Sequence, residues 1–421
     1  MLLSRVRHFL LLVIVLPLFA AAQDLEQKVV PGRVNSPEQQ HKPYVILISA
    51  DGFRWDLADK YHAVNLLRLR EQGVTAASMI PSFPSLTFPN HYTLITGLYP
   101  AHHGLVDNGF YDEKRGKRYG MSAKDAVADS SWYGGTPLWV LAEQQHMLSA
   151  SFYWVASESA IQGVRPTYYY IYNDKIDMPA RIHAVKAWLQ LPEAKRPHFI
   201  TFYLPQVDHE EHTYGPESKE AEEAVHFVDE SIGALVASVD SLHLPVNFIF
   251  VADHGMTTVD TQHPMSLPAA VDTNKFVVPM GDALVHLYAK DKKDVLPTYE
   301  ALKKGGGDFD TYLASDIPTR WNYSKQDDRY NRVGDILLVP RLPKVFNLGT
   351  RATTPGKHGF DNALFDMHAS FYAWGPAFKE HLHIPSFENV HVFPLVAMLL
   401  GLNYSEDSID GRAAILKPIL K

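Results

Sequence analysis

Apolar runs without polar alternation recur along the chain and predict buried strands. The first is YVILISA, residues 44–50, which ends at Asp51-Gly52. A run of this kind is typical of a strand that is buried on both faces of a parallel sheet. Comparable runs cover residues 150–157, 198–208, 246–255 and 368–376. We therefore expect these segments to form one central sheet.

Segments with helical periodicity lie between these runs. Apolar side chains recur at spacings of three and four residues in 56–72, 180–192, 218–240 and 390–400. Strands that alternate with helices predict an α/β fold, in which a mostly parallel central sheet is flanked by helices. Residues 259–350 interrupt this alternation with two short strands, one helix and loops. We expect them to form a small inserted α+β subdomain.

The first 22 residues have the layout of a secretory signal peptide. Arg5 and Arg7 precede an apolar run over residues 9–19, and three alanines end at Ala22. The run is shorter than the roughly 20 residues of a membrane-spanning helix. We expect cleavage after Ala22, no stable membrane insertion, and a periplasmic or secreted protein. Polar residues 23–42 would then form an N-terminal lead before a catalytic domain over 43–421.

Charge and cysteine content limit the classes of partner and cofactor. The formal net charge of −8 becomes −10 without residues 1–22, and there is no dense basic run. This balance argues against binding of long nucleic acid, whereas small anionic substrates suit a site where a metal supplies positive charge. An exported chain with no cysteine fits a bacterial periplasm, and any metal must be held by Asp, Glu or His. No oligomeric state is predicted.

Acidic and histidine side chains fall where the predicted strands end. Asp51 closes the first run, Asp208 and His212 follow the run from residue 198, and Asp253-His254 ends the run from residue 246. His358 lies in GKHGF, shortly before the last run. Because the carboxyl ends of parallel strands meet at one edge of a sheet, we expect these side chains to converge. Asp and His without Cys favour two zinc ions or similar divalent metals.

Each of these residues also has an ordinary structural explanation. Asp-Gly and Asp-His-Gly are common turn sequences, and Asp208 suits the N-cap of a helix. His358 would serve equally as a loop residue without a partner. We favour the metal site because four such groups coincide at predicted strand ends.

The stretch PSFPSLTFPNHYTLITG, residues 81–97, predicts a proline-punctuated loop and then a helix that begins between Thr87 and Asn90. A threonine at a helix start is a common N-cap. The backbone N–H groups and the dipole at that position also favour an anion. A neighbouring metal would lower the pKa of the Thr87 hydroxyl and make it a nucleophile for displacement at phosphorus. The two roles are compatible.

Taken together, these motifs resemble the nucleotide pyrophosphatase/phosphodiesterase family of the alkaline phosphatase superfamily. They occur in order in ISADGFRWD, PSLTFPNHYTLITGLYPAHHG, VDNGFYD, VDHEEHTYGP, VADHGM and GKHGF, and the match runs from about residue 43 to the C-terminus. The resemblance implies an alkaline phosphatase-like fold. Since the chain has no cysteine-rich or nuclease-like module, it is similar to a minimal bacterial form of the family.

The resemblance also implies roles for individual residues. Thr87 would be the nucleophile and would form a covalent nucleotidyl-threonine. Asn108 and the backbone N–H of Thr87 would hold a phosphoryl oxygen, in the manner of an oxyanion hole. Two zinc ions would be bound, one by Asp51, Thr87, Asp253 and His254, and the other by Asp208, His212 and His358.

In family members that act on nucleotides, the base lies between aromatic side chains. By resemblance, the substrate-binding residues would be Phe88, Asn108, Met121, Trp154, Tyr172 and Tyr203. The alternative for the tyrosines at 168–172 is packing in the core, which we expect for at least two of them. Stacking tolerates any base, so we expect broad acceptance of small nucleotides.

The implied reaction is hydrolysis of nucleoside triphosphates to monophosphate and pyrophosphate, of dinucleotide polyphosphates and of aryl nucleotide diesters. Two alternatives are a choline-headgroup or lysophospholipid phosphodiesterase, for which the tyrosines would cage a quaternary ammonium, and a phosphomonoesterase. The sequence places no arginine near Thr87 or Asn108 to bind the extra charge of a monoester, which favours a diester. A catalytically inactive binding protein is disfavoured because every expected ligand and the nucleophile are present.

Overall fold

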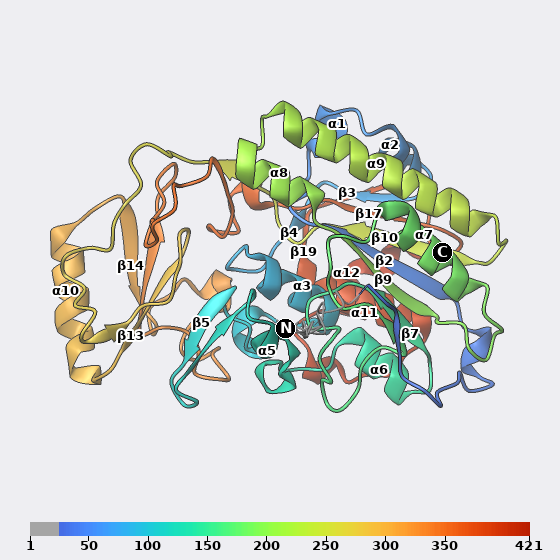
Figure 1. Ribbon diagram of the computed structural model, residues 1–421, viewed down its shortest axis with the longest axis horizontal. Helices are drawn as coiled ribbons and strands as arrows, with labels where there is room; N and C mark the ends of the chain where they lie inside the picture. Colours follow the sequence, from blue (N-terminus) through green and yellow to red (C-terminus); the bar gives the residue numbers. More distant parts are fainter. Residues whose placement is uncertain (1–24) are drawn as a thin grey trace, which may run out of the picture.

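The computed structural model describes residues 25–421, and the signal peptide predicted over 1–22 lies outside them. A central sheet has the strand order β1-β8-β7-β9-β2-β10-β17-β3-β18 (Figure 1). Every residue of β2 and β10 is buried, which accounts for their unbroken apolar pattern. The parallel strands in the middle of the central sheet are β7 (Ser149–Phe152), β9 (Phe199–Leu204), β2 (Tyr44–Ala50) and β10 (Val246–Val251).

Antiparallel strands occur toward the two edges of this sheet. β17 (Phe371–Trp374) runs antiparallel to β10 and to β3 (Val74–Ala76), and β18 (Leu382–Ile384) is parallel to β3. At the other edge, β8 (Tyr168–Tyr169) is parallel to β7 and antiparallel to β1 (Lys28–Val29). The sheet is mostly parallel, as predicted, and part of the N-terminal lead is built into it.

Helices cover both faces of the central sheet (Figure 1). One layer contains α1 (Leu57–Lys60), α2 (Val64–Glu71), α7 (Met178–Leu189), α8 (Gln206–Tyr214) and α9 (Lys219–Asp240). The other contains α3 (Thr87–Thr96), α6 (Leu138–Gln144), α11 (Val392–Leu400) and α12 (Ala413–Leu416), with α4 (Pro100–His103) packed on α3. Among the helices of residues 25–421, none has both the length and the apolar character needed to cross a membrane.

Two predicted elements differ from the structure. The helix expected over 56–72 is divided into α1 and α2, because His62 takes a left-handed backbone conformation with φ of 52° between them. The strand expected over 198–208 ends at Leu204. Pro205 follows it and has no N–H to continue the ladder, so Asp208 lies in the first turn of α8 and not at the end of a strand.

A second, antiparallel sheet lies beside the central one (Figure 1). Its strands, in spatial order, are β12 (Phe276–Val277), β13 (Val285–Ala289), β15 (Ile336–Pro340) and β14 (Phe309–Leu313), and α10 (Val295–Gly305) packs against it. It has an apolar core of its own, which includes Leu287, Leu302 and Ile336. These elements all fall within 259–350, although the domain limits themselves stay a prediction.

A buried arginine joins the second sheet to a hairpin next to the central one. The hairpin consists of β5 (Gly109–Asp112) and β6 (Lys117–Gly120). Arg332, which precedes β15, is buried and donates from Nε to Asp112 Oδ2 at 3.0 Å. Its Nη1 donates to two carbonyl oxygens, that of Gly104 at 2.9 Å and that of Trp132 at 2.6 Å. Loss of the Arg332 side chain would leave these buried acceptors without a hydrogen-bond donor, which destabilises a folded protein.

We expect Arg332→Ala to lower the free energy of unfolding by roughly 3–5 kcal/mol, because it leaves the buried Asp112 carboxylate without its partner. The measurement is the shift of the urea unfolding midpoint. The matched control is Arg70→Ala, which breaks the more exposed pair with Asp59 and should cost about 1 kcal/mol or less. Equal shifts for the two variants would contradict a structural role for the buried pair.

Candidate active site

The predicted strand-end residues meet at the carboxyl edge of the central sheet. Asp51 directly follows β2, which lies between β9 and β10, so the segments that follow all three strands are neighbours. The Asp208 N–H donates to the Asp51 carbonyl at 3.1 Å. Gly52 has a φ of 72°, and a Cβ at this position would come within 3.0 Å of the Asp208 Cα. A glycine is needed there for both reasons.

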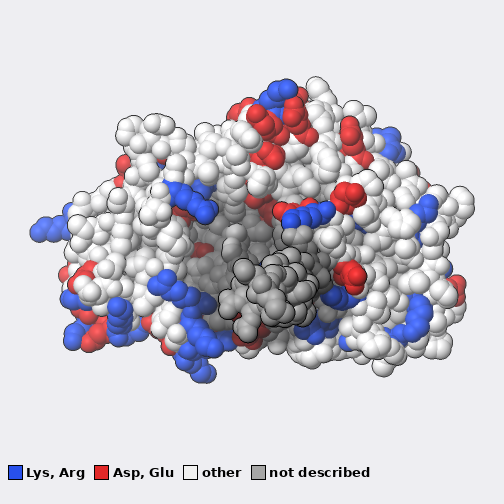
Figure 2. Space-filling model, in the orientation of Figure 1, with Lys and Arg blue, Asp and Glu red and all other residues white. Residues whose placement is uncertain are grey.

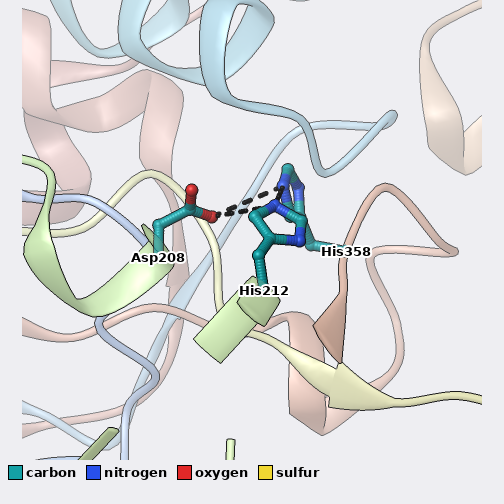
Figure 3. A group of neighbouring side chains, drawn as sticks. All are labelled: Asp208, His212 and His358. Carbon is teal, nitrogen blue, oxygen red and sulfur yellow. Dashed lines mark hydrogen bonds and ion pairs between the residues drawn. The ribbon is translucent and has the colours of Figure 1, made fainter. Parts of the chain in front are cut away.

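One side-chain group consists of Asp208 and His212 from α8 and His358 from the loop after β16 (Gly356–Lys357), and the three side chains face one another (Figure 3). The two histidine Nε2 atoms lie 3.1 Å apart, and they lie 3.4 Å and 3.5 Å from Asp208 Oδ1. Each Nδ1 donates to a backbone carbonyl at 2.9 Å, that of Gly356 or that of Ser85. Both Nε2 atoms therefore present lone pairs to the same point, as metal-binding histidines do.

The second group contains Asp51, Asp253 and His254. His254 Nδ1 donates to the Gly255 carbonyl at 3.0 Å, and its Nε2 lies 2.9 Å from Asp253 Oδ2 and 3.6 Å from Asp51 Oδ1. The other Asp253 oxygen accepts from the Gly52 N–H at 3.2 Å. As in the first group, backbone contacts orient side chains whose remaining acceptor atoms converge.

Within residues 25–421, three buried carboxylate oxygens of this cluster have no hydrogen-bond donor, namely Asp51 Oδ1, Asp208 Oδ1 and Asp253 Oδ2. Burial, and then the charges of Asp253 and Asp208, raise the pKa of Asp51 well above its usual range. Burial alone would raise the pKa of Asp253, but His254 and His91 bring it well below the usual range. Burial, with His254 and His212 nearby, lowers the pKa of His358 and keeps its ring neutral.

Unpaired carboxylate oxygens together with imidazole nitrogens form a donor set that suits a divalent cation such as zinc. The residues form three groups, in each of which the ligand atoms lie within 4.8 Å of one another, and the groups share Asp51 and Asp208. They are Asp208, His212 and His358, then Asp51, Asp208 and His254, and then Asp51, His91 and Asp253. The residues fit more than one cation, and the number and the division of the ligands into two sets stay predictions.

Thr87 is the first residue of α3, and its hydroxyl oxygen lies 3.2 Å from His254 Nε2. The N-cap position belongs to Leu86, which has extended backbone angles, so the alternative role of Thr87 as the N-cap is wrong. The structure thus places this hydroxyl at the N-terminus of a helix and beside the second group.

Asn90 holds the proline-rich loop that leads to Thr87. Its buried side-chain amide donates to the carbonyls of Pro84 and Leu86 at 2.8 and 2.9 Å. Its oxygen accepts from the Ser82 N–H at 2.7 Å and from the Asn389 amide at 2.8 Å. All the hydrogen-bonding capacity of Asn90 is used to shape the turn before α3.

Asn108 is fixed next to Thr87. Its side-chain oxygen accepts from the backbone N–H of Phe88 at 2.9 Å, which commits the oxygen and leaves the amide N–H groups available. The preceding residue, Asp107, lies 3.5 Å from Nε2 of His286 on β13. The second sheet therefore supports the turn that carries Asn108.

His91 belongs to the site although no sequence motif pointed to it. It lies one helical turn after Thr87 and is completely buried. Its Nδ1 lies 3.0 Å from the Thr87 carbonyl and 3.3 Å from Asp253 Oδ2, and its Nε2 lies 2.8 Å from the Ser49 hydroxyl. The available signal was its spacing of four residues from Thr87, which places both on one face of a helix.

The predicted substrate residues divide into exposed and buried ones. Tyr172 is 51% exposed and Met121 is 45% exposed, and the Phe88 ring lies at a tilt against Tyr119. Trp154 is buried and donates from its indole N–H to the His91 carbonyl at 3.0 Å, so it supports α3 from within the core. Its role in a substrate pocket, like those of the other five residues, stays a prediction.

Tyr203 contacts the metal-ligand cluster directly. Burial, and then the charge of Asp51, raise the pKa of Tyr203 well above its usual range, so the phenol stays protonated. Its hydroxyl donates to Asp51 Oδ2 at 2.6 Å, and its ring meets that of Tyr172 edge-on at 6.1 Å. The core packing expected of two neighbouring tyrosines is present, since Tyr168 is buried and Tyr170 stacks on Phe152 at 4.3 Å.

Comparison with known proteins identifies one family of similar enzymes. A family model described as "Type I phosphodiesterase / nucleotide pyrophosphatase" matches residues 45–361. Ectonucleotide pyrophosphatase/phosphodiesterase family member 1 of Mus musculus is 35% identical over 382 residues, which are 87% of this chain and 42% of that protein. A venom phosphodiesterase of Naja atra is 33% identical over 397 residues, 91% of this chain and 47% of that protein. The chain thus spans less than half the length of these relatives.

Solved structures of similar fold include the murine ectonucleotide pyrophosphatase/phosphodiesterase 5 in an inactive threonine-to-alanine form, in complex with AMP. It is 27% identical to this chain and superimposes with a TM-score of 0.83, over 90% of this chain and all of that one. The human enzyme of the same name gives a TM-score of 0.83 at 26% identity. The alkaline phosphatase-like α/β fold that the sequence predicts is thereby confirmed.

We expect His91→Phe to weaken zinc binding about 10- to 100-fold, the usual effect of losing a residue that orients a metal ligand. Phenylalanine keeps the edge contacts with Trp154 and Tyr203 but has no ring nitrogen to hold Asp253. Zinc affinity is measured by competition with a chromophoric chelator.

The matched control is His102→Phe, which removes a histidine paired with Asp410 at 2.7 Å, away from the cluster. It should leave zinc affinity unchanged. If both variants bound zinc as tightly as the parent chain, His91 would have no part in holding Asp253.

Proposed function

Because the chain belongs to the type I phosphodiesterase/nucleotide pyrophosphatase family, we propose that it is a secreted or periplasmic two-zinc hydrolase of nucleotide phosphodiester and phosphoanhydride bonds. The observation that carries the proposal is the Thr87 hydroxyl, held 3.2 Å from His254 Nε2 beside three carboxylates whose facing oxygens lack donors. The names of the relatives, which include ectoenzymes and venom enzymes, and the AMP complex support it.

Thr87 acts as the nucleophile in this proposal. Its Oγ1 forms a bond to phosphorus, the bond to the leaving-group oxygen breaks, and the hydroxyl proton is released. Water then hydrolyses the nucleotidyl-threonine and restores the free hydroxyl. His254 cannot turn away from Thr87, because its Nδ1 is committed to the Gly255 carbonyl.

Zinc ions held by Asp51, Thr87, Asp253 and His254, and by Asp208, His212 and His358, would supply positive charge that lowers the pKa of a nucleophile and stabilises charge at phosphorus. The protein adds donors of its own. The backbone N–H of Thr87, the first residue of α3, and the amide N–H groups of Asn108 are available to a phosphoryl oxygen, where negative charge develops. The hydrogen bond between Phe88 N–H and Asn108 Oδ1 fixes the Asn108 amide relative to the start of α3.

Substrates in this proposal are nucleoside triphosphates, dinucleotide polyphosphates and aryl nucleotide diesters. Tyr172, exposed at the surface beside Tyr203, offers a ring face to a base on one side, and Phe88 is proposed to offer the other. Stacking holds a base by its ring face and makes no contact with its hydrogen-bonding edge. We therefore expect the enzyme to accept several bases.

We expect Thr87→Ala to hydrolyse the p-nitrophenyl ester of thymidine 5′-monophosphate roughly 1000-fold more slowly or worse, because the nucleophile is absent. Zinc content should be retained through the remaining Asp and His ligands. Thr87→Ser, which keeps a hydroxyl, is the matched control and should keep substantial activity. Turnover by Thr87→Ala near that of the parent chain would refute the assignment of the nucleophile.

We expect Tyr172→Ala to raise KM for the same nucleotide ester by roughly 5- to 100-fold, which corresponds to the loss of one base stack, with a smaller change in kcat. KM and kcat are obtained from initial rates. The comparison substrate is p-nitrophenylphosphorylcholine, which has no base. Faster hydrolysis of the choline ester than of the nucleotide ester by the parent chain would favour a headgroup phosphodiesterase instead.

A further inference from the structure

A groove of about 1060 Å³ runs beside the candidate active site, between the end of the β5–β6 hairpin and the segment 346–354 that follows the second sheet. Its lining residues include Asn108 and Leu86, the residue before Thr87. Phe88 and Tyr172, the proposed base site, are not among its lining residues, whereas Met121, which was also predicted to bind substrate, is one of them. The groove is therefore a second space that adjoins the position of the phosphoryl group.

A phosphodiester or phosphoanhydride substrate has two arms on its phosphorus atom. If one arm lies between Phe88 and Tyr172, the other must leave the site in a different direction, because an in-line displacement places the leaving group opposite the nucleophile. Asn108 lines the groove and holds Phe88 N–H at 2.9 Å, so the groove reaches the proposed oxyanion donors. The groove is therefore near enough to these donors to receive the second arm.

The groove is lined mainly by apolar side chains with flexible thioethers at its mouth. Met121 and Met280 are 45% and 63% exposed, although both are large and apolar. Exposed apolar side chains that gather in a concave site mark a binding surface, and methionine packs well against aromatic rings. The larger apolar lining residues are Leu86, Met121, Met280, Leu284, Phe346 and Leu348.

The charges of the groove favour an anion. Asp282 is paired with Lys357 at 2.7 Å, and Asp107 accepts from the Gly109 N–H at 2.9 Å, so both acids have partners. Arg351 lines the groove and is exposed, and within residues 25–421 its guanidinium has no ion pair. Lys and Arg side chains also gather on the neighbouring hairpin, where Lys114, Lys117 and Arg118 are exposed (Figure 2).

We propose that this groove binds the leaving group when that group carries a second nucleoside, with the base against Met121 and Met280 and a phosphate near Arg351. The proposal rests on the proposed function and narrows it, since dinucleotide polyphosphates would be preferred over substrates with a small leaving group. The volume of the groove is at the upper end of the range for small-molecule sites and accommodates a nucleotide.

The test compares kcat/KM for diadenosine tetraphosphate with kcat/KM for the p-nitrophenyl ester of thymidine 5′-monophosphate in the full chain loaded with zinc. Met280→Ala should lower the ratio of the two values by about 2- to 10-fold, the range expected for one thioether–ring contact. Arg351→Ala should lower it by roughly 10-fold through loss of a charged hydrogen bond. The matched control is Leu296→Ala, an equally exposed apolar residue on α10 that does not line the groove, and its ratio should not change.

An unchanged ratio in both groove variants would overturn the proposal, even if both substrates were hydrolysed well. Hydrolysis of the aryl ester without hydrolysis of diadenosine tetraphosphate by the parent chain would also overturn it, while the proposed function would stand. If the parent chain hydrolysed neither substrate, the proposed function itself would fall and the groove proposal with it.

Discussion

The repulsion among three buried carboxylates is the constraint around which this molecule is arranged. A carboxylate oxygen of Asp51 lies within 4.8 Å of one from Asp208 and within 4.8 Å of one from Asp253, and each carboxylate has an oxygen without a donor. At that separation two unit charges repel by roughly 3–4 kcal/mol for an effective dielectric constant of 20. The segments that follow the parallel strands β2, β9 and β10 hold the acids together in spite of this cost, which a bound cation would offset.

The histidines and the nucleophile are positioned by backbone contacts and not by the acids. The backbone carbonyls of Ser85, Gly356 and Gly255 each accept a hydrogen bond from the Nδ1–H of a histidine. The Nε2 atoms of these three histidines are therefore directed to the cluster. The Ser85 carbonyl belongs to the loop that delivers Thr87. The shape of that loop thus determines the positions of both Thr87 and His358, and a buried Asn90 uses all its hydrogen-bonding groups to hold that shape.

The sequence predicted the central strands, because runs such as YVILISA have to be buried on both faces, and it predicted the acids at their ends. It could not predict strand direction, since an apolar run has no polarity, and β17 proved antiparallel. The strand predicted from the sequence included Asp208 because apolar Val207 follows Pro205. His91 was missed because a histidine inside an apolar helix gives no local sign of a partner that lies far away in sequence, such as Asp253.

The second sheet contacts the loops beside the candidate active site as well as the central sheet. His286 on β13 supports Asp107 next to Asn108, and Arg332 ties the turn before β15 to Asp112. A Cβ at Gly359, next to His358, would come within 2.8 Å of Leu86 and 3.2 Å of Ala283, so three distant segments meet there without free space. None of the side chains that β12, β13, β14 and β15 contribute is among the potential metal ligands of residues 25–421. The second sheet therefore supports the loops beside Asn108 and Thr87, while the segments that follow the strands of the central sheet supply the potential metal ligands.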